Sequence, residues 1–318
     1  ARQVWFRPPA NIWRHWRNIP QSKIMVPDGD IPIFILKCLK ALYGLVDAPL
    51  LWQLALLHYL KLDIGYRMST HDECFLMIID GWQVISLCII HVDDLLLAAT
   101  RKFLDFIAKK LGQKFGNPKR TSLPFLYLGM KHEMLSPGHL LVHQQHYLEK
   151  LPEGKFTNAV NMKKDFQELD EYEHHQFRSL VCSLLWLCLT RIDIAHDVVA
   201  LQSEMICPQV QHLKMANKVL IRARKTKEYN GLHYHQMRFP IKLCSIHDCG
   251  HASKKSCYPY EGKFVMMMHD SLKNDAPEWL SGQDLAHVGG YAHTVFYSAR
   301  KATRVSPSTR HDETPSAD

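Results

Sequence analysis

Two adjacent carboxylates, Asp93 and Asp94, interrupt an apolar stretch in the segment IIHVDDLLLAA. The apolar runs on both sides predict the two strands of a buried hairpin, with the acidic pair at its tip. Negative charge in such surroundings requires a compensating cation. Carboxylate oxygens favour Mg²⁺, and two divalent ions about 3.5 to 4 Å apart support phosphoryl transfer to a sugar hydroxyl. The alternative is ordinary turn chemistry without a catalytic role.

Positive charge is concentrated in two regions, and the formal net charge of +8 favours a polyanionic partner. Residues 1–27 interleave arginines with tryptophans, which suits phosphates and stacked bases or, alternatively, arginines lying over core tryptophans. Residues 211–227 predict an amphipathic helix. Its basic face, which is either a nucleic-acid backbone site or a solvated surface, carries Lys214, Lys218, Arg222 and Lys225.

Length and composition predict a globular chain. With 318 residues and 47% hydrophobic residues, the chain can form two or three compact units. No apolar run approaches the roughly 18 to 20 residues of a membrane span, and no signal peptide is visible, so we expect an intracellular protein, cytoplasmic or nuclear, without a membrane partner. The nine cysteines, among them Cys38, Cys88, Cys182 and Cys188, are expected to be reduced core residues.

The elements that must position these residues follow from periodicity and from breaks at Pro and Gly. Strands are predicted on both sides of the acidic turn within residues 84–99, followed by a helix over Phe103 to Phe115. Residues 172–206 predict a long helical region that precedes the basic helix. Beyond a boundary near Phe239 and Pro240, strands are predicted at Ile241 to Ile246, Gly262 to Met268 and Thr294 to Ser298.

Several blocks resemble the copia-type retrotransposon Pol polyprotein. LKALYGLVDAPLLW, Leu39 to Trp52, is similar to that family's Leu-Lys-x-x-Leu-Tyr-Gly-Leu-Lys-Gln-x-Pro-x-x-Trp block of the reverse transcriptase. Three further family-like blocks follow in order: STHDECFL at 69–76, HVDD at 91–94 and FLYLGMKHE at 125–133. Residues 177–198 and 212–234 resemble the helical region before the ribonuclease H domain, and CSIHDCGHASKKS resembles that domain's first strand.

This resemblance implies specific site residues. Asp93 and Asp94 would be polymerase metal ligands, while Asp248 and Glu313 would be the first two ribonuclease H carboxylates, with Mg²⁺ or Mn²⁺ as cofactor. Residues near the nucleotide and template would be Lys40, Tyr43, Gly44 and Pro49, and those near the primer Leu128 and Gly129. The implied partners are an RNA template, a DNA primer, an RNA–DNA hybrid and a dNTP.

The resemblance also implies an α/β (α+β) fold. Residues 1–118 would form a truncated fingers and palm unit, and residues 119–165 a thumb-like segment. Residues 166–238 would form a helical connection, and residues 239–318 a partial ribonuclease H-like domain. The sequence does not determine the oligomeric state.

Departures from the family pattern predict a catalytically incomplete chain. The first polymerase aspartate precedes a segment that here begins at Arg2, and a later ribonuclease H aspartate would follow Asp318. Substitutions relative to the family pattern stand at Val46, Asp47, His91, Cys182, Ile192 and Lys225. One alternative is an incomplete copy of an active polyprotein. Another is a non-enzymatic nucleic-acid-binding protein that uses regions 1–27 and 211–227, with steep salt dependence.

A zinc module is a further alternative for the histidine- and cysteine-rich C-terminal region. Its ligands would come from Cys244, His247, Cys249, His251 and Cys257, although no Cys-x-x-Cys knuckle is present. The remaining histidines, including HYH at 233–235 and the pair His174 and His175, receive no role, because isolated histidines on helices and strands are usually structural.

Overall fold

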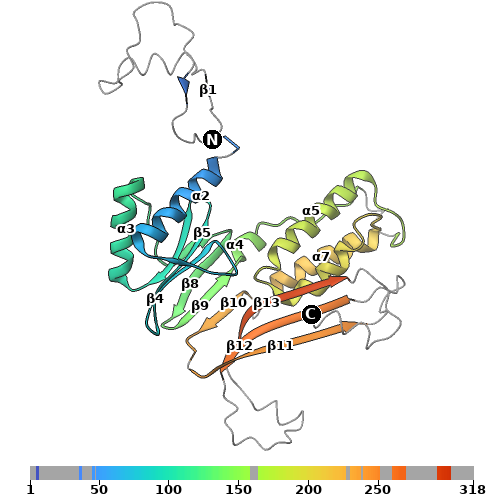
Figure 1. Cartoon of the computed structure of the whole chain (residues 1–318). Coiled ribbons are helices and arrows are strands. Elements are labelled where there is room, and N and C mark those ends of the chain that lie inside the picture. The colour runs from blue at the N-terminus through green and yellow to red at the C-terminus, as the bar shows by residue number, and fades with distance from the viewer. Residues whose placement is uncertain are drawn as a thin grey trace, which may run out of the picture. The chain divides into compact units, whose positions relative to one another are not determined.

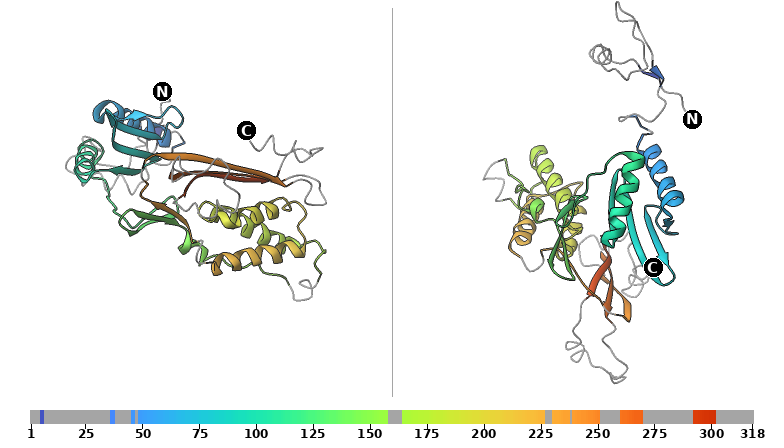
Figure 2. Two further views of the ribbon diagram at one scale, coloured as in Figure 1. Left: turned by 90° about the horizontal axis from the view of Figure 1, so that it is seen from below. Right: turned by 90° about the vertical axis from the view of Figure 1, so that its left-hand side faces the viewer.

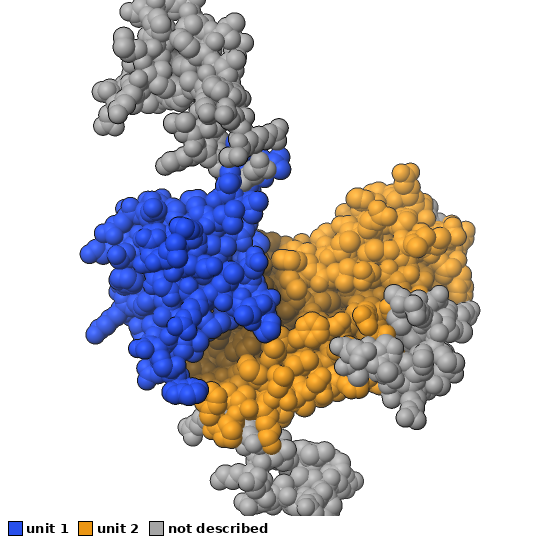
Figure 3. Space-filling model, viewed as in Figure 1, with its two compact units in different colours: residues 1–120 blue, residues 121–318 orange. Residues whose placement is uncertain are grey.

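The helices and antiparallel sheets of the chain form two units, residues 1–120 and 121–318 (Figure 3). The computed structural model describes residues 5–6, 36–37, 45–46, 48–157, 164–226, 230–237, 239–250, 260–269 and 292–301. This mixed architecture confirms the α+β prediction, while the assignment of subdomains within it stays a prediction. Within the described ranges, none of the helices has the length and apolar character needed to cross a bilayer.

Unit 1 contains a four-stranded antiparallel sheet in the order β3-β4-β5-β6. Its strands are β3 (Arg67–Met68), β4 (Phe75–Asp80), β5 (Gln83–His91) and β6 (Asp94–Ala99). The helical elements are α2 (Ala48–Tyr59), the π-helical turn η1 (Leu60–Ile64) and α3 (Arg101–Phe115). A separate two-stranded ladder pairs β1 (Trp5–Phe6) with β2 (Leu36–Lys37).

One face of the unit 1 sheet is covered by α2 and α3 (Figure 2). Cross-strand neighbours Leu76, Cys88 and Leu97 share this face because side chains alternate along a strand. They pack against Leu56 of α2 and Ile107 of α3. Burial raises the pKa of the Cys88 thiol to about 12, so this cysteine is the reduced core residue predicted from the sequence.

Unit 2 begins with a second antiparallel sheet in the order β10-β9-β8-β7 (Figure 1). Its strands are β7 (Phe125–Tyr127), β8 (Met130–Ser136), β9 (His139–His143) and β10 (Leu232–His235), and the short helix α4 (Gln145–Leu148) follows β9. Strand β10 comes from a distant part of the sequence and forms an edge of the sheet.

The helical part of unit 2 consists of α5 (Glu171–Leu187), η3 (Ile192–Ile194), α6 (Ala195–Gln202) and α7 (Val210–Lys225). Helix α5 begins with a capping box, in which Glu173 N donates to Asp170 Oδ1 at 2.8 Å. The predicted helical region, residues 172–206, contains three of these elements, α5, η3 and α6. Cys182 of α5 is exposed, which corrects its assignment to the core, whereas Cys188 is buried.

The last sheet pairs β11 (Ile241–Gly250), β12 (Tyr260–His269) and β13 (Ala292–Lys301) in chain order, all antiparallel. This confirms the three strands predicted beyond Pro240. The sheet lies against the helices of unit 2 (Figure 2). The hydroxyl groups of Tyr260 and Ser203 are 2.9 Å apart, and the Tyr297 hydroxyl donates to the carbonyl of Cys188.

Candidate functional site

The acidic hairpin has the predicted position in the fold. Strand β5 pairs with β6 up to the cross-strand pair His91 and Asp94, so the chain reverses within the two residues Val92 and Asp93. The alternation of side chains puts Asp94 on the sheet face opposite α2 and α3, together with Leu96. The sheet thus presents the two carboxylates at the turn of the hairpin that includes its edge strand β6.

The tip is exposed, and this corrects the predicted burial. Asp93 and Asp94 are both exposed, and neither side-chain carboxylate makes a hydrogen bond or an ion pair to another described residue. The strands are buried only on the face that the helices cover. Burial therefore does not require a cation at this tip, because exposed carboxylates are solvated by water. Their availability as ligands rests instead on having no partner among the described residues.

The turn at the tip is strained. Val92 has φ of 55°, a left-handed conformation that is unfavourable for a β-branched residue. Two-residue hairpins with positive φ at the first turn position normally carry glycine there. Such strain is often found at functional sites.

Replacing Val92 with glycine is expected to raise the free energy of unfolding by about 0.5 to 1 kcal/mol. The relief of left-handed strain, about 1 to 2 kcal/mol, exceeds the entropic cost of glycine, about 0.5 to 1 kcal/mol. Urea denaturation measures the change. The control is Val84→Gly, at an exposed position of the extended strand β5, which should destabilise the protein. If Val92→Gly also destabilised the protein, Val92 would not be strained in its left-handed conformation.

The residues predicted near the nucleotide are mostly outside the described part of the chain. Lys40, Tyr43 and Gly44 lie outside it, as does Asp47. Pro49 lies in the first turn of α2, where proline is favoured, and it is exposed. Of the basic region 1–27, the structure describes the backbone of β1 alone. The nucleotide and template roles stay predictions.

The residues predicted near the primer form a turn. Within the FLYLGMKHE block, Leu128 and Gly129 connect strand β7 to strand β8, and both have positive φ. This is the geometry of a type I′ hairpin turn. A Cβ at Gly129 would lie 3.2 Å from Cζ2 of Trp186 in α5. The glycine therefore serves both the turn and its packing against the helix.

The predicted basic helix is α7, and its apolar face is buried as expected. Its basic stripe is partly neutralised: Lys214 Nζ lies 2.6 Å from Asp165, and Arg222 Nη2 lies 2.5 Å from Asp197. Lys218 and Lys225 are exposed and have no ion pair among the described residues. Two of the four stripe residues thus remain available to an anionic partner.

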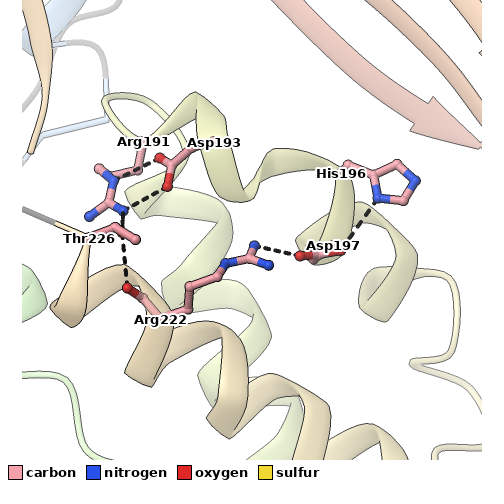
Figure 4. Close-up of polar contacts among 6 residues, drawn as sticks. All are labelled: Arg191, Asp193, His196, Asp197, Arg222 and Thr226. Atoms are coloured by element: carbon pink, nitrogen blue, oxygen red, sulfur yellow. Dashed lines mark hydrogen bonds and ion pairs between the residues drawn. The ribbon is translucent and has the colours of Figure 1, made fainter. Parts of the chain in front are cut away.

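A buried arginine joins the C-terminal end of α7 to the segment before α6 (Figure 4). The Arg191 guanidinium donates to both carboxylate oxygens of Asp193, at 2.8 and 2.7 Å, and to the Thr226 hydroxyl at 2.7 Å. It also donates to the carbonyl of Ala223 at 2.6 Å. In the same view the exposed Arg222 forms an ion pair with the half-buried Asp197, and the Thr226 hydroxyl donates to the Arg222 carbonyl at 2.9 Å. Sequence reasoning did not detect this network.

The predicted ribonuclease H carboxylates are described in part. Asp248 lies on β11 and is exposed, and its Oδ1 accepts a hydrogen bond from Cys249 N at 2.9 Å. Glu313 lies outside the described residues, so the pairing of these two carboxylates stays a prediction.

The zinc module predicted around β11 does not form among its described members. Cys244 lies on the opposite sheet face from His247 and Cys249, because its position in the strand differs from theirs by an odd number, three and five. The other two suggested ligands, His251 and Cys257, lie outside the described residues. This prediction is wrong for the described part of the chain, where the candidate metal-binding group contains none of these residues.

That group consists of three histidines to which the sequence assigned no role: His139, His233 and His235. Their ligand atoms lie within 4.8 Å of one another, and all three side chains are half-buried. Burial, reinforced by the neighbouring histidines, lowers the pKa of His233 and His235. The signal available in the sequence was the period-two spacing of His233 and His235 in a predicted strand, which puts both on one face.

Two further histidines of this sheet, the half-buried His132 and the buried His143, also have lowered pKa values. Burial lowers the pKa of His132, against a hydrogen bond to the carbonyl of Met130 and with a smaller contribution from His143. Burial also lowers the pKa of His143, whose Nε2 lies 3.2 Å from Glu133; Lys131 and His146 act in the same direction as burial. The folded state thus favours the neutral form of both rings.

Acidification is expected to destabilise the protein. Between the usual histidine pKa of 6.5 and the lower folded values, the unfolded chain binds more protons, so the free energy of unfolding falls as pH decreases from about 7. The midpoint of urea denaturation, measured from pH 7.5 to 5, checks this. His143→Gln should flatten the dependence, whereas His175→Gln, at an exposed position of α5, should preserve it. The same pH dependence of stability in all three proteins would show that His143 does not cause it.

Comparison with known proteins finds relatives among transposon polyproteins. Over 203 residues, 61% of the chain, the sequence is 28% identical to the retrovirus-related Pol polyprotein from transposon RE1 of Arabidopsis thaliana. It is 26% identical, over the same length, to the polyprotein from transposon RE2 of that plant. It is also 28% identical over 203 residues to the putative transposon Ty5-1 protein of Saccharomyces cerevisiae.

The chain covers 14% of the length of each plant polyprotein and 64% of the yeast protein. No family model matches the chain, and no solved structure matches it significantly. These relatives agree with the resemblance to transposon Pol polyproteins that the sequence blocks showed. They support the origin of this chain in the Pol polyprotein of a retrotransposon.

Proposed function

We propose that the chain derives from the reverse transcriptase and ribonuclease H region of a copia-type retrotransposon Pol polyprotein. The observation that carries this proposal is the hairpin of β5 and β6, which presents two unpartnered carboxylates at the tip of a helix-backed antiparallel sheet. The order of the family-like blocks and the similarity to transposon polyproteins support it.

Asp93 and Asp94 are the residues that would hold a divalent cation. Both are exposed acceptors without an ion pair among the described residues, and carboxylate oxygens match the preference of Mg²⁺ and Mn²⁺. When bound, such ions activate a primer hydroxyl and stabilise the leaving phosphate oxygen in nucleotidyl transfer. A dNTP, an RNA template and a DNA primer are the corresponding substrates. By the same reasoning, Asp248 would serve hydrolysis of an RNA–DNA hybrid.

We further propose that this chain catalyses nucleotidyl transfer weakly or not at all. Among the described residues, no third histidine, cysteine or carboxylate completes a ligand group with Asp93 and Asp94. Catalysis depends steeply on ligand number and alignment, so an incomplete set binds metal weakly and positions it poorly.

The test combines Mn²⁺ titration with primer extension on an RNA template. The chain is compared with Asp93→Asn and with Asp80→Asn, a matched change at the tip of the other hairpin of the same sheet. Weak Mn²⁺ binding that Asp93→Asn abolishes and Asp80→Asn retains would support the metal site. Equal binding by all three proteins would contradict it. Efficient extension by the unmodified chain would overturn the proposed incompleteness.

A non-enzymatic nucleic-acid-binding function is the second candidate, and the unpaired Lys218 and Lys225 of α7 favour it. Phosphate contacts release counterions, so affinity for RNA should fall steeply with salt. Replacing both lysines with glutamine should reduce the slope of log affinity against log salt by about 2, or about 1 per contact. Lys214→Gln is the control, because Lys214 is already paired with Asp165. An unchanged slope in the double variant would show that Lys218 and Lys225 do not contact the RNA backbone.

A further inference from the structure

We propose that His139, His233 and His235 form a binding site for a divalent transition metal of the Zn²⁺ class. The site belongs to the β9–β10 ladder of unit 2 and is separate from the acidic residues to which the proposed function assigns Mg²⁺. The inference rests on strand register, the geometry of the ring nitrogens and the hydrogen bonds that orient the rings. It does not depend on the proposed function.

Strand pairing brings the three side chains together. Strands β9 and β10 are antiparallel, and His235 lies directly opposite His139. His233 lies two residues before His235, so it is on the same face and diagonal to His139. Facing pairs have Cβ atoms about 4.5 to 5.5 Å apart, which is within reach for two imidazoles to share one ion.

The ring nitrogens already approach the spacing of ligands on one ion. His139 Nε2 lies 2.9 Å from His233 Nδ1, and one ligand atom from each of the three rings lies within 4.8 Å of the others. Zn–N bonds of about 2.0 to 2.1 Å at tetrahedral angles separate two ligand nitrogens by about 3.3 Å. The rings of His139 and His235 are stacked with centroids 3.9 Å apart, so a shared ion requires these side chains to rotate from the present arrangement. A cation between the rings of His139 and His233 replaces the hydrogen bond that now joins them.

The His233 ring also has the orienting contact typical of a metal ligand. His233 Nε2 lies 3.0 Å from Asn230 Oδ1, an acceptor, so this nitrogen carries the proton and Nδ1 is left with its lone pair facing His139. Donation from the second ring nitrogen to an oxygen is the usual arrangement in protein metal sites. On β10, His235 N donates to His293 Nε2 at 2.8 Å, which anchors the backbone of this edge strand.

Two glycines bring the ladder ends into position. Gly138, with φ of 79°, forms the turn before His139, and its carbonyl accepts from Gln236 N at 2.7 Å. A Cβ at Gly231 would lie 2.5 Å from the carbonyl oxygen of Val142, so only glycine allows β10 to approach β9 this closely where the strand begins. The backbone around the three histidines is therefore held at both ends.

The ligand chemistry selects the metal. Three imidazoles without a carboxylate in the group favour borderline ions such as Zn²⁺, Ni²⁺ and Cu²⁺ over Mg²⁺ and Ca²⁺. His139 and His233 are 94 residues apart in the sequence, so a shared ion ties the edge strand to the rest of the sheet. Because an ion that binds only the folded state stabilises it, Zn²⁺ should raise the melting temperature.

The first experiment titrates ZnCl₂ into the full chain, prepared without a histidine tag and treated with chelator, by isothermal calorimetry. We expect one site per chain, and His233→Ala should weaken binding by about 100-fold or more, because loss of an outer-shell partner alone costs about 10- to 100-fold. His175→Ala, an exposed change elsewhere in unit 2, is the control because the chain has 20 histidines. Equal Zn²⁺ affinity of all three proteins would show that His233 is not a ligand and would contradict the proposed site.

A second measurement removes the dependence on variant folding. Co²⁺ bound to the unmodified chain should show visible absorption bands of a tetrahedral nitrogen-ligated ion, and excess Zn²⁺, but not excess Mg²⁺, should abolish them. Bands of an octahedral aquo ion, or displacement by Mg²⁺, would contradict the proposal. Mn²⁺ binding that Asp93→Asn removes should persist in His233→Ala, so failure of one site is distinguishable from failure of the other.

Discussion

Replacement of Arg191 by alanine is expected to lower the free energy of unfolding by about 3 to 5 kcal/mol, the cost of breaking a buried ion pair on one side. Arg191 is 2% exposed, and its guanidinium makes four hydrogen bonds to Asp193, Ala223 and Thr226 (Figure 4). Without it, the Asp193 carboxylate loses its bidentate partner, and the carbonyl of Ala223 loses a donor at the end of α7.

Urea denaturation followed by circular dichroism measures this loss. The control is Arg222→Ala, which removes an arginine from the same view, but one that is 47% exposed in its pair with Asp197. Exposed pairs contribute about 0 to 1 kcal/mol, so the control should be nearly neutral. Arg191→Lys should fall between them, because lysine retains the charge but not the planar fork. Similar losses for Arg191→Ala and Arg222→Ala would show that burial does not govern the interaction.

Local patterns predicted the elements that carry the candidate sites. The alternation around Asp93 and Asp94 located the β5–β6 hairpin, since a two-residue reversal between apolar strands leaves few other arrangements. The 3.6-residue period of residues 211–227 identified both the buried and the basic face of α7. In each case the information lies within one or two elements, where sequence spacing determines geometry.

Exposure and long-range partners could not be predicted in the same way. The hairpin strands are apolar on both faces, yet helices cover one face only, so the sequence overestimated the burial of Asp93 and Asp94. The pairing of Lys214 with Asp165 depends on how a distant loop packs. The His139 and His233 contact depends on which strand β9 accepts as its neighbour. Strand order and register are tertiary properties, and no local period encodes them.

Truncating a core side chain of unit 2 should destabilise the protein as much as removing the buried Arg191. Phe177→Ala is expected to lower the free energy of unfolding by about 3 to 5 kcal/mol, the range for removing a buried aromatic ring. Phe177 is fully buried in α5 and belongs to the apolar cluster that joins α5, α6 and α7. Its ring lies 6.5 Å from that of His212 in α7, so the cavity would open at the contact between the two helices.

The matched control is Tyr172→Ala on the same helix, where the aromatic side chain is 51% exposed and its removal leaves no cavity. Phe177→Leu should recover more than half of the loss, because leucine fills most of the volume without a polar atom. Thermal and urea denaturation of the three variants provide the comparison. If Phe177→Ala lowered the free energy of unfolding no more than Tyr172→Ala, α5 and α7 would not share a close-packed core. Packing would then not fix the orientation of the basic face of α7. A loss in the expected range would mean that the orientation of Lys218 and Lys225 is fixed by apolar packing on the opposite face of the same helix.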